Sequence, residues 1–298
     1  MRKEFRKLGK SPNPVRITLN MKRLYIVFLF LYLVFLFLFN ERIVHSLSVV
    51  NTLYFNRYLI SLFPFILFTN LLLKSGFIPD FHRWCRKRNA DRLFEIFSIF
   101  LIVLIGVPGN VQFIDYLKST GIVEEEEKEN LLRSFGGISF PFIFLVILRE
   151  HPLRKEILFL FLASEMLYYC FFRKKCSKEK EYRYEEYTMS VIRQTGYSLF
   201  VILFSLLSFT SLAFLFDWID EPYRYLLNGL VEFSYNNIRL CQIGTETSYR
   251  MLMFLLSFTS LSLIVQIRSV DPSFRLFGYL KARFCIALFS LCAFLLLL

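Results

Sequence analysis

Apolar stretches recur along the whole chain, and most charged residues gather between them. Predominantly apolar runs occupy residues 24–39, 58–73, 96–114, 134–148, 157–172, 194–216, 225–247, 251–267 and 283–298. A helix crosses about 30 Å of hydrocarbon with about 20 mostly apolar residues. The pattern therefore predicts an all-α, polytopic integral membrane protein with about seven spanning helices.

Two of these stretches are interrupted by residues that do not continue a helix easily. The first reads Ile-Gly-Val-Pro-Gly-Asn over residues 105–110, and the second carries Asn228, Gly229 and Glu232. Proline lacks an amide hydrogen, and glycine tolerates unusual dihedral angles. Within a membrane, such breaks survive only where protein or a water-filled cavity satisfies the backbone. We predict two re-entrant helical hairpins, at residues 94–121 and 225–247, and expect them to form the solute site.

Composition and charge agree with a membrane protein. Hydrophobic residues make up 55% of the chain and the net charge is +12. The basic residues cluster in a few loops, which favours membrane topology over nucleic-acid binding. The positive-inside rule places the amino terminus and residues 83–92, 173–183 and 268–283 in the cytoplasm. The first hairpin then enters from the cytoplasm and the second from the opposite side, which is the geometry of an inverted repeat.

These patterns divide the chain into five parts. They are a basic cytoplasmic segment (1–23), a first membrane helix with its loop (24–50), a first half (51–172), a charged cytoplasmic linker (173–189) and a second half (190–298). Asn-Glu-Arg-Ile follows the first apolar run instead of small residues, so we expect an uncleaved helix and not a signal peptide. Residues 124–133 read as an acidic, solvated helical linker.

Catalytic and metal-binding motifs are missing from the sequence. The six cysteines form no CxxC pair, and the three histidines are scattered in or beside loops. We find neither a nucleophile with its base nor an HExxH-type motif. The expectation is that the protein is not an enzyme and uses no cofactor or metal.

Four short patches resemble a known family. They are Gly106-Val107-Pro108-Gly109-Asn110, Ser139-Phe140-Pro141-Phe142, Gly229-Leu230-Val231-Glu232-Phe233-Ser234 and residues 258–266. Their order and spacing over residues 50–298 resemble the sporulation integral membrane proteins of the YlbJ/SpoVV family, in the nucleoside-recognition Gate domain group. The chain departs from the family at Val107, Thr259, Ser260 and Ile264, where the family has Tyr, Gly, Gly and His.

The resemblance implies a transporter of dipicolinic acid in the outer forespore membrane during spore formation. The expected partners are a small anionic solute, the lipid bilayer and a coupling proton or cation, without nucleic acid. The residues themselves leave two alternatives open. One is transport of another small solute, such as a nucleoside or a carboxylate, and the other is a membrane scaffold that transports nothing.

Glu232, the candidate residue whose insertion into a membrane costs the most free energy, lies in the second hairpin. A carboxylate within the membrane costs about 2.5–3.5 kcal/mol on insertion scales, so Glu232 suggests function. On one continuous helix Asn228, Glu232, Asn236 and Arg239 form a polar stripe. Glu232 is then protonated, coordinates a cation or orients Ser234 and Asn236. Alternatively, the stripe packs into the bundle and Arg239 satisfies Glu232.

The remaining candidates lie in the first hairpin and in two later helices. Asn110 and the amides that follow Pro108 form either an anion-receptive helix start or a structural turn. Ser139 and Ser262 occupy equivalent places in the two halves and either line a cavity or simply pack. The predicted solute-binding residues are Gly106, Pro108, Gly109, Asn110, Ser139, Glu232, Ser234, Asn236, Ser262 and Gln266. Glu165 stays outside this set, and snorkelling or pairing with Lys155 are both open for it.

Overall fold

The computed structural model describes residues 26–27, 29–173, 191–213, 216 and 218–297. It divides the chain into two compact units, residues 1–46 and residues 47–298. The predicted segment 1–23 lies outside the described residues, as does all of the predicted linker 173–189 except Arg173. The first unit contains a short apolar helix over Leu29–Leu38, within the predicted first membrane helix.

The described residues are helical and contain no β-strand, which confirms the all-α prediction. The helices are α2 (Asn40–Leu53), α3 (Leu59–Lys74), α4 (Phe77–Lys87), α5 (Asp91–Ile105), α6 (Gly109–Ser119), α7 (Glu125–Phe135), α8 (Phe140–Phe142), α9 (Arg154–Phe172), α10 (Val191–Ala213), α11 (Tyr223–Val231), α12 (Ser234–Ile243), α13 (Glu246–Ser257), α14 (Leu261–Val270) and α15 (Leu276–Leu297). Two π-helical turns, η1 (Tyr54–Tyr58) and η2 (Ile143–Ile147), precede α3 and follow α8.

Five stretches in the described part of the chain are long and apolar enough to cross a membrane. They are Asn40–Lys74, Glu125–Ile147, Val191–Leu212, Glu246–Val270 and Leu276–Leu297. Large apolar side chains are exposed on several helices, including Phe100, Phe159, Phe200 and Phe204. A soluble protein rarely exposes so many large apolar side chains, so this surface fits a lipid environment. The chain is a multi-pass membrane protein by these criteria.

Four breaks interrupt the helices of the second unit. Break 1 (residues 106–108) separates α5 from α6, and break 2 (residues 136–139) separates α7 from α8. Break 3 (residues 232–233) separates α11 from α12, and break 4 (residues 258–260) separates α13 from α14. Breaks 1 and 3 lie where the sequence predicts interruptions. Breaks 2 and 4 lie inside stretches that the sequence analysis assigned to unbroken spans.

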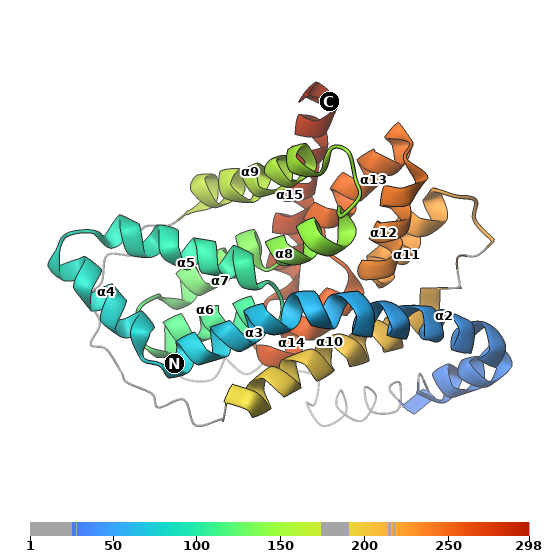
Figure 1. The fold of residues 1–298 in the computed structure, drawn as a ribbon, viewed down its shortest axis with the longest axis horizontal. Coiled ribbons are helices and arrows are strands. Elements are labelled where there is room, and N and C mark those ends of the chain that lie inside the picture. The colour runs from blue at the N-terminus through green and yellow to red at the C-terminus, as the bar shows by residue number, and fades with distance from the viewer. Residues whose placement is uncertain (1–25, 28, 174–190, 214–215, 217, 298) are drawn as a thin grey trace, which may run out of the picture. The chain divides into compact units, whose positions relative to one another are not determined.

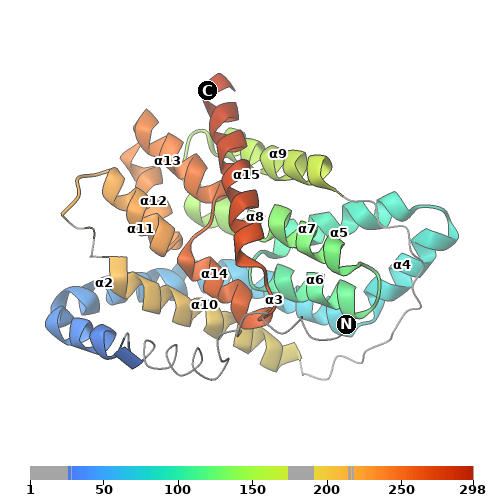
Figure 2. The same cartoon turned by 180° about the vertical axis from the view of Figure 1, so that it is seen from behind.

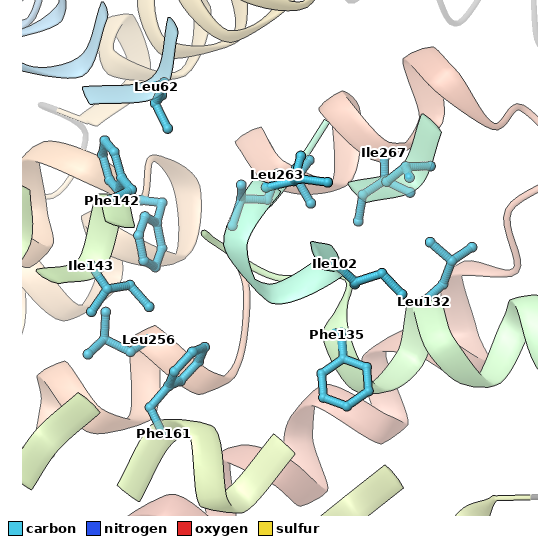
Figure 3. Packing of buried hydrophobic residues seen from close by; sticks show 14 of the residues in the cluster. Leu62, Ile102, Leu132, Phe135, Phe142, Ile143, Phe161, Leu256, Leu263 and Ile267 are labelled. Carbon is cyan, nitrogen blue, oxygen red and sulfur yellow. The ribbon is translucent and has the colours of Figure 1, made fainter. Parts of the chain in front are cut away.

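The helices of residues 47–298 share one core. Figures 1 and 2 show α3 beside α10, with the two helices running in opposite directions. Helix α15 packs against α7, α9 and α13. Figure 3 shows buried side chains from these different elements meeting in the core, among them Leu62 of α3, Phe142 of α8 and Leu263 of α14. This packing brings segments that are distant in the sequence to the four breaks.

Candidate functional site

A small cavity lies where breaks 1, 2 and 3 approach α14, the helix that follows break 4. Its volume is about 40 Å³, and it is lined by Tyr58, Leu62, Val107, Ile138, Ser139, Phe142, Ile202, Leu206, Phe233, Ser234, Ser262, Leu263 and Gln266. The lining is mostly apolar, with three hydroxyls, one amide and the phenol of Tyr58 as its polar groups. A cavity needs about 10–15 Å³ of such volume to hold one water molecule, so this cavity holds only a few waters.

Three of the five polar lining residues lie at the beginnings of helices. Ser139 is the N-cap of α8, Ser234 is the first residue of α12, and Ser262 is the second residue of α14. Val107 stands just before α6. The amino-terminal end of a helix carries partial positive charge and amide hydrogens without intrahelical partners. In this structure the protein itself binds amides at these starts, because Glu232 accepts from Ser234 and Tyr235, and Ser260 accepts from Leu263. No charged side chain belongs to the cavity lining.

Break 1 is tied to break 2 by short contacts. The amide of Val107 donates to the carbonyl of Gly137 at 3.2 Å, and the side-chain amide of Asn110 donates to the carbonyl of Phe135 at 2.8 Å. Gly106 has φ +67°, and a Cβ added to it would lie 2.3 Å from the backbone nitrogen of Ser139. Only glycine combines this dihedral angle with so close an approach.

These contacts correct part of the prediction for the first hairpin. The backbone amide of Asn110 donates to the carbonyl of Gly106 at 2.8 Å, and its side-chain amide is also bound by the protein. Asn110 thus holds the two breaks together instead of presenting free donors to a solute. Gly106, Pro108, Gly109 and Asn110 all lie at break 1, yet none of them belongs to the cavity lining. Their neighbour Val107 does.

Break 3 is closed by its own residues. The carboxylate of Glu232 accepts hydrogen bonds from the backbone amides of Ser234 (2.6 Å) and Tyr235 (3.1 Å). The side-chain amide of Asn236 donates to the carbonyl of Glu232 at 3.0 Å. Glu232 is 1% exposed and caps the start of α12. A carboxylate at this position satisfies orphan amides and interacts favourably with the helix dipole.

The predicted polar stripe on one helix is therefore wrong. Helix α11 ends at Val231 and α12 begins at Ser234, so Asn228 and Asn236 lie on different helices. The alternative pairing of Glu232 with Arg239 is also wrong, because Arg239 donates to the hydroxyl of Tyr225 and to Gln242. Both predictions assumed one continuous helix through Glu232. The helix breaks there instead, and Glu232 caps the start of α12. Glu232 and Asn236 stand behind Ser234, which lines the cavity.

Ser139 and Ser262 both line the cavity, but they are not equivalent in position. The hydroxyl of Ser139 accepts from the amide of Phe142 at 3.2 Å as an N-cap. The corresponding N-cap of α14 is Ser260, whose hydroxyl accepts from the amide of Leu263 at 3.3 Å. Ser260 and Ser262 are joined by a hydrogen bond of 2.8 Å. Ser260, and not Ser262, is thus the counterpart of Ser139 as an N-cap, because α14 begins at Leu261.

Two further polar groups complete the cavity. Gln266 donates from its side-chain amide to the hydroxyl of Ser205 on α10 at 2.7 Å. The ring of Tyr58 packs edge-on against that of Phe142, with 4.9 Å between the ring centroids. The hydroxyl of Tyr58 is buried and has no hydrogen-bond partner among the described residues. The sequence analysis missed Tyr58, which ends η1 at the start of a predicted span and carries no local signal of a role.

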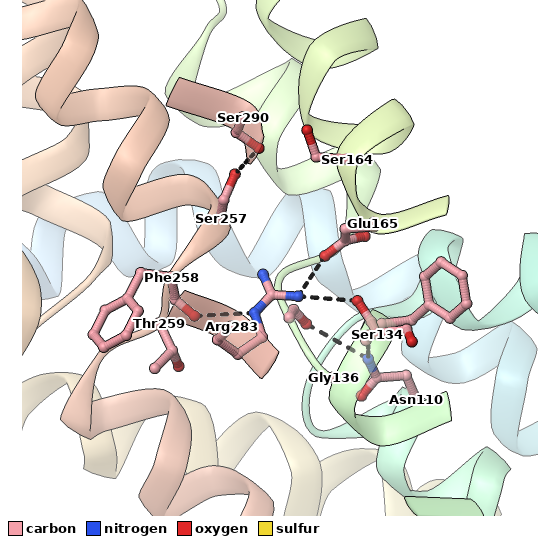
Figure 4. Close-up of polar contacts among 12 residues, drawn as sticks. Asn110, Ser134, Gly136, Ser164, Glu165, Ser257, Phe258, Thr259, Arg283 and Ser290 are labelled. Atoms are coloured by element: carbon pink, nitrogen blue, oxygen red, sulfur yellow. Dashed lines mark hydrogen bonds and ion pairs between the residues drawn. The ribbon is translucent and has the colours of Figure 1, made fainter. Parts of the chain in front are cut away.

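The sequence analysis also missed a buried ion pair close to breaks 2 and 4. Arg283 of α15 donates to Glu165 of α9 at 2.7 Å, and the two residues are 1% and 3% exposed. Figure 4 shows Arg283 between Glu165, the carbonyl of Ser134 and the carbonyl of Phe258. Both proposed fates of Glu165, snorkelling and pairing with Lys155, are wrong. A charge within an apolar run at both positions was the signal that could have suggested the pair.

The acidic helical linker is α7, and it is less solvated than predicted. Lys128 is buried, and its ammonium group lies 2.8 Å from a carboxylate oxygen of Asp115 and 2.8 Å from one of Asp271. Burial opposes ionisation of Asp271, but hydrogen bonds from Lys128 and Ser273 hold the pKa of this carboxyl below its usual value. The ion pair between Glu129 and Arg133 forms at 2.7 Å. Lys128 therefore connects α7 to the residue that ends α14.

No family model, curated protein or solved structure matches the chain.

Proposed function

We propose that this chain is a membrane transporter of a small anionic solute, held between two re-entrant hairpins. The observation that carries the proposal is the origin of the cavity lining. Val107, Ile138 and Ser139 come from the first half of the chain, and Phe233, Ser234 and Ser262 come from the second half. Broken helices that meet at one cavity are the usual construction of a solute site in repeat-built transporters.

The order of elements supports an inverted repeat. The first half contains the long helix α3, the interrupted pair α5/α6, the broken helix α7/α8 and the long helix α9. The second half contains α10, α11/α12, α13/α14 and α15 in the same order. Helices α3 and α10 would be equivalent in this scheme, and they lie side by side in opposite directions. Opposite direction of matched elements is expected when one half is inverted relative to the other.

The helix starts at the cavity support an anionic solute. Helices α12 and α14 begin at the cavity with Ser234 and Ser262, and α6 begins beside Val107. The helix dipole favours negative charge at such ends, and the buried carboxylate of Glu232 already takes this position at α12. By resemblance to the sporulation proteins, dipicolinic acid is the first solute to test. Its ring does not fit a cavity of about 40 Å³, so the described arrangement is a closed one that must open for transport.

Uptake by the purified protein tests this function. The full-length chain is reconstituted into liposomes, and accumulation of radiolabelled dipicolinate is compared with that in protein-free liposomes. We expect saturable uptake that unlabelled dipicolinate inhibits. Cells lacking the protein should accumulate less dipicolinate in their spores. Absence of uptake for dipicolinate, for other carboxylates and for nucleosides would leave the membrane scaffold as the better proposal.

A nucleoside is the second candidate solute, because the cavity lining contains aromatic rings and no charged side chain. Tyr58 and Phe142 provide ring surfaces, while Gln266 and the serines provide hydrogen-bonding groups. Competition distinguishes the two solutes. If uridine inhibits dipicolinate uptake poorly and is not itself transported, the anion remains the substrate. Transport of uridine without transport of dipicolinate would reverse the assignment.

A further inference from the structure

An anionic solute in this cavity lacks a cationic side chain in the lining itself. A deeply buried cation, Arg283, lies beside break 2. A Cβ added to Gly137 would lie 2.9 Å from Nη2 of Arg283 and 3.3 Å from Oε1 of Glu165. Ile138 and Ser139, the next two residues, line the cavity. Because Gly137 carries no side chain, the guanidinium group lies against the backbone of break 2, and the two residues that follow Gly137 line the cavity.

The hydrogen bonds of Arg283 leave part of its guanidinium group available. Nε donates to the carbonyl of Phe258 at 2.9 Å, and Nη1 donates to the carbonyl of Ser134 at 3.0 Å and to Glu165 at 2.7 Å. An arginine has five N–H donors, and none from Nη2 has an acceptor among the described residues. In Figure 4 no dashed line reaches this third nitrogen. Arg283 thus has one carboxylate partner and unused donors on the side of Gly137.

We propose that Arg283 binds the carboxylate of the transported anion, and that Glu165 occupies the place of that carboxylate while the solute is absent. The inference rests on the proposed function and adds the cationic group that the cavity lining lacks. Arginine holds carboxylates through paired, charge-assisted hydrogen bonds. Inside a protein, where the effective dielectric constant is far below that of water, such a pair is much stronger than on the surface.

Exchange of one carboxylate for another requires a proton. Two ionised carboxylates beside one guanidinium group repel each other, and one of them is favoured in its protonated form. Binding of the solute carboxylate therefore goes together with transfer of one proton from water to Glu165. Protonated Glu165 then still accepts a hydrogen bond from Arg283 through its carbonyl oxygen, and the solute carboxylate becomes the counter-ion of Arg283. The proposal predicts co-transport of one proton with each carboxylate bound in this way.

Few charged or titratable side chains of the described residues surround Glu165, which supports its assignment as the internal counter-ion of Arg283. Among the described residues, the charged or titratable side chains that interact with Glu165 are Arg283 and, more weakly, Tyr279, both on α15. Helix α7 and break 4 contribute to this cluster the carbonyls of Ser134 and Phe258, which accept from Arg283. Tyr279 donates to the carbonyl of Gly136 at 2.7 Å. No second carboxylate of the described chain shares Arg283.

Arg283 also connects the solute to both halves of the chain. Ser134 lies in the last turn of α7, just before break 2, and Phe258 opens break 4 after α13. Cations are favoured at the carboxyl ends of helices, because the last carbonyls have no intrahelical partners. A shift of the guanidinium group toward a solute would loosen both of these contacts at once. Solute binding would in this way act on the two broken helices together.

Three variants of the full-length protein test the inference through dipicolinate binding. Gly137→Ala places a methyl group against Nη2 and blocks the approach of a solute carboxylate, while Arg283 and Glu165 stay intact. Gly196→Ala is its matched control, because a Cβ at Gly196 meets no atom within 4 Å. Arg283→Gln removes the charge, and Glu165→Gln keeps the shape of the internal counter-ion without its charge. Equilibrium binding of radiolabelled dipicolinate is measured as a function of pH.

The outcomes separate this inference from the proposed function. We expect Gly137→Ala and Arg283→Gln to weaken dipicolinate binding about tenfold or more, an effect of about 1.4 kcal/mol, and Gly196→Ala to leave it unchanged. Glu165→Gln should bind at least as tightly as the wild type and should lose the pH dependence of binding. Unchanged affinity in Gly137→Ala, with a pH dependence that persists in Glu165→Gln, would overturn the role of Arg283 while wild-type uptake still supports transport. A wild-type protein that neither binds nor transports dipicolinate would overturn both.

Discussion

Breaks 1 and 3, which separate α5 from α6 and α11 from α12, are held in different ways. Break 1 depends on another segment, because Val107 and Asn110 donate to the carbonyls of Gly137 and Phe135. Break 3 depends on itself, because Glu232 accepts from the two amides that follow it. The first hairpin tip is fixed to α7 and break 2, whereas the second is satisfied within its own turn.

This difference indicates which hairpin can move at the lower free energy. Separating break 1 from break 2 exposes buried donors and carbonyls, and each unsatisfied group costs about 1–3 kcal/mol. Moving α12 as a unit leaves the hydrogen bonds of Glu232 intact, because donor and acceptor move together. We therefore expect the second hairpin to be the moving gate and the first to be the fixed wall of the cavity.

Of the substitutions that test this contrast between the two hairpins, Gly106→Ala should cause the largest loss of stability. The new Cβ would collide with the backbone of Ser139 at 2.3 Å, at a φ of +67° that L side chains adopt rarely. Strain and overpacking each cost about 1–3 kcal/mol, so we expect a loss of about 2–5 kcal/mol. Thermal unfolding of the purified protein and its abundance in the membrane measure this loss.

Gly196→Ala is the matched control for Gly106→Ala. A Cβ at Gly196 would meet no atom within 4 Å, and no positive φ is involved. A Gly196 variant that is as unstable as the Gly106 variant would show that the two breaks are not locked through Gly106 and Ser139.

Asn110→Ala should have an intermediate effect. It removes the hydrogen bond from the buried side-chain amide to the carbonyl of Phe135 and leaves that carbonyl unsatisfied, for about 1–3 kcal/mol. Hydrogen exchange should become faster at the amide of Val107, which donates to Gly137 across the same contact. Asn236→Ala, which removes a bond inside the second hairpin, should accelerate exchange in α12 alone. Equal and widespread exchange in both variants would contradict the contrast between the hairpins.

The sequence allowed prediction of breaks whose cause is local. Gly106 and Pro108 interrupt a helix by their own backbone properties, and Gly229 with Glu232 marks the second interruption. Break 4 contains Phe258, Thr259 and Ser260, none of which stops a helix by itself. It depends on α15, where Arg283 binds the carbonyl of Phe258 and Tyr279 lies near the hydroxyl of Thr259. Such long-range satisfaction of a backbone leaves no periodic trace in the sequence.

For the candidate site too, the sequence allowed prediction of residues near the breaks but not of roles that depend on distant partners. Ser139, Ser234, Ser262 and Gln266 were predicted and line one cavity. The roles of Asn110 and Glu232 depended on partners that only the fold supplies. Periodicity placed Glu232 on a continuous helix, but a buried carboxylate next to free amides is satisfied best by capping them. At Glu232 capping was favoured over continuation of the helix, and this determined the hydrogen bonds that the carboxylate makes.

Glu232→Gln should have the smallest effect on stability and the most selective effect on function. A glutamine oxygen still accepts from one of the amides of Ser234 and Tyr235, but it cannot hold both as a carboxylate does. We expect a loss of about 0.5–1 kcal/mol, at the low end for an N-cap, with membrane abundance unchanged. Hydrogen exchange at these two amides should increase, and dipicolinate uptake should fall, because the gating hairpin no longer moves as one capped unit. Glu232→Ala, which removes both acceptors, should extend the same changes. Full uptake by both variants, with faster exchange confined to Ser234 and Tyr235, would make Glu232 a structural cap and shift the moving gate to the first hairpin.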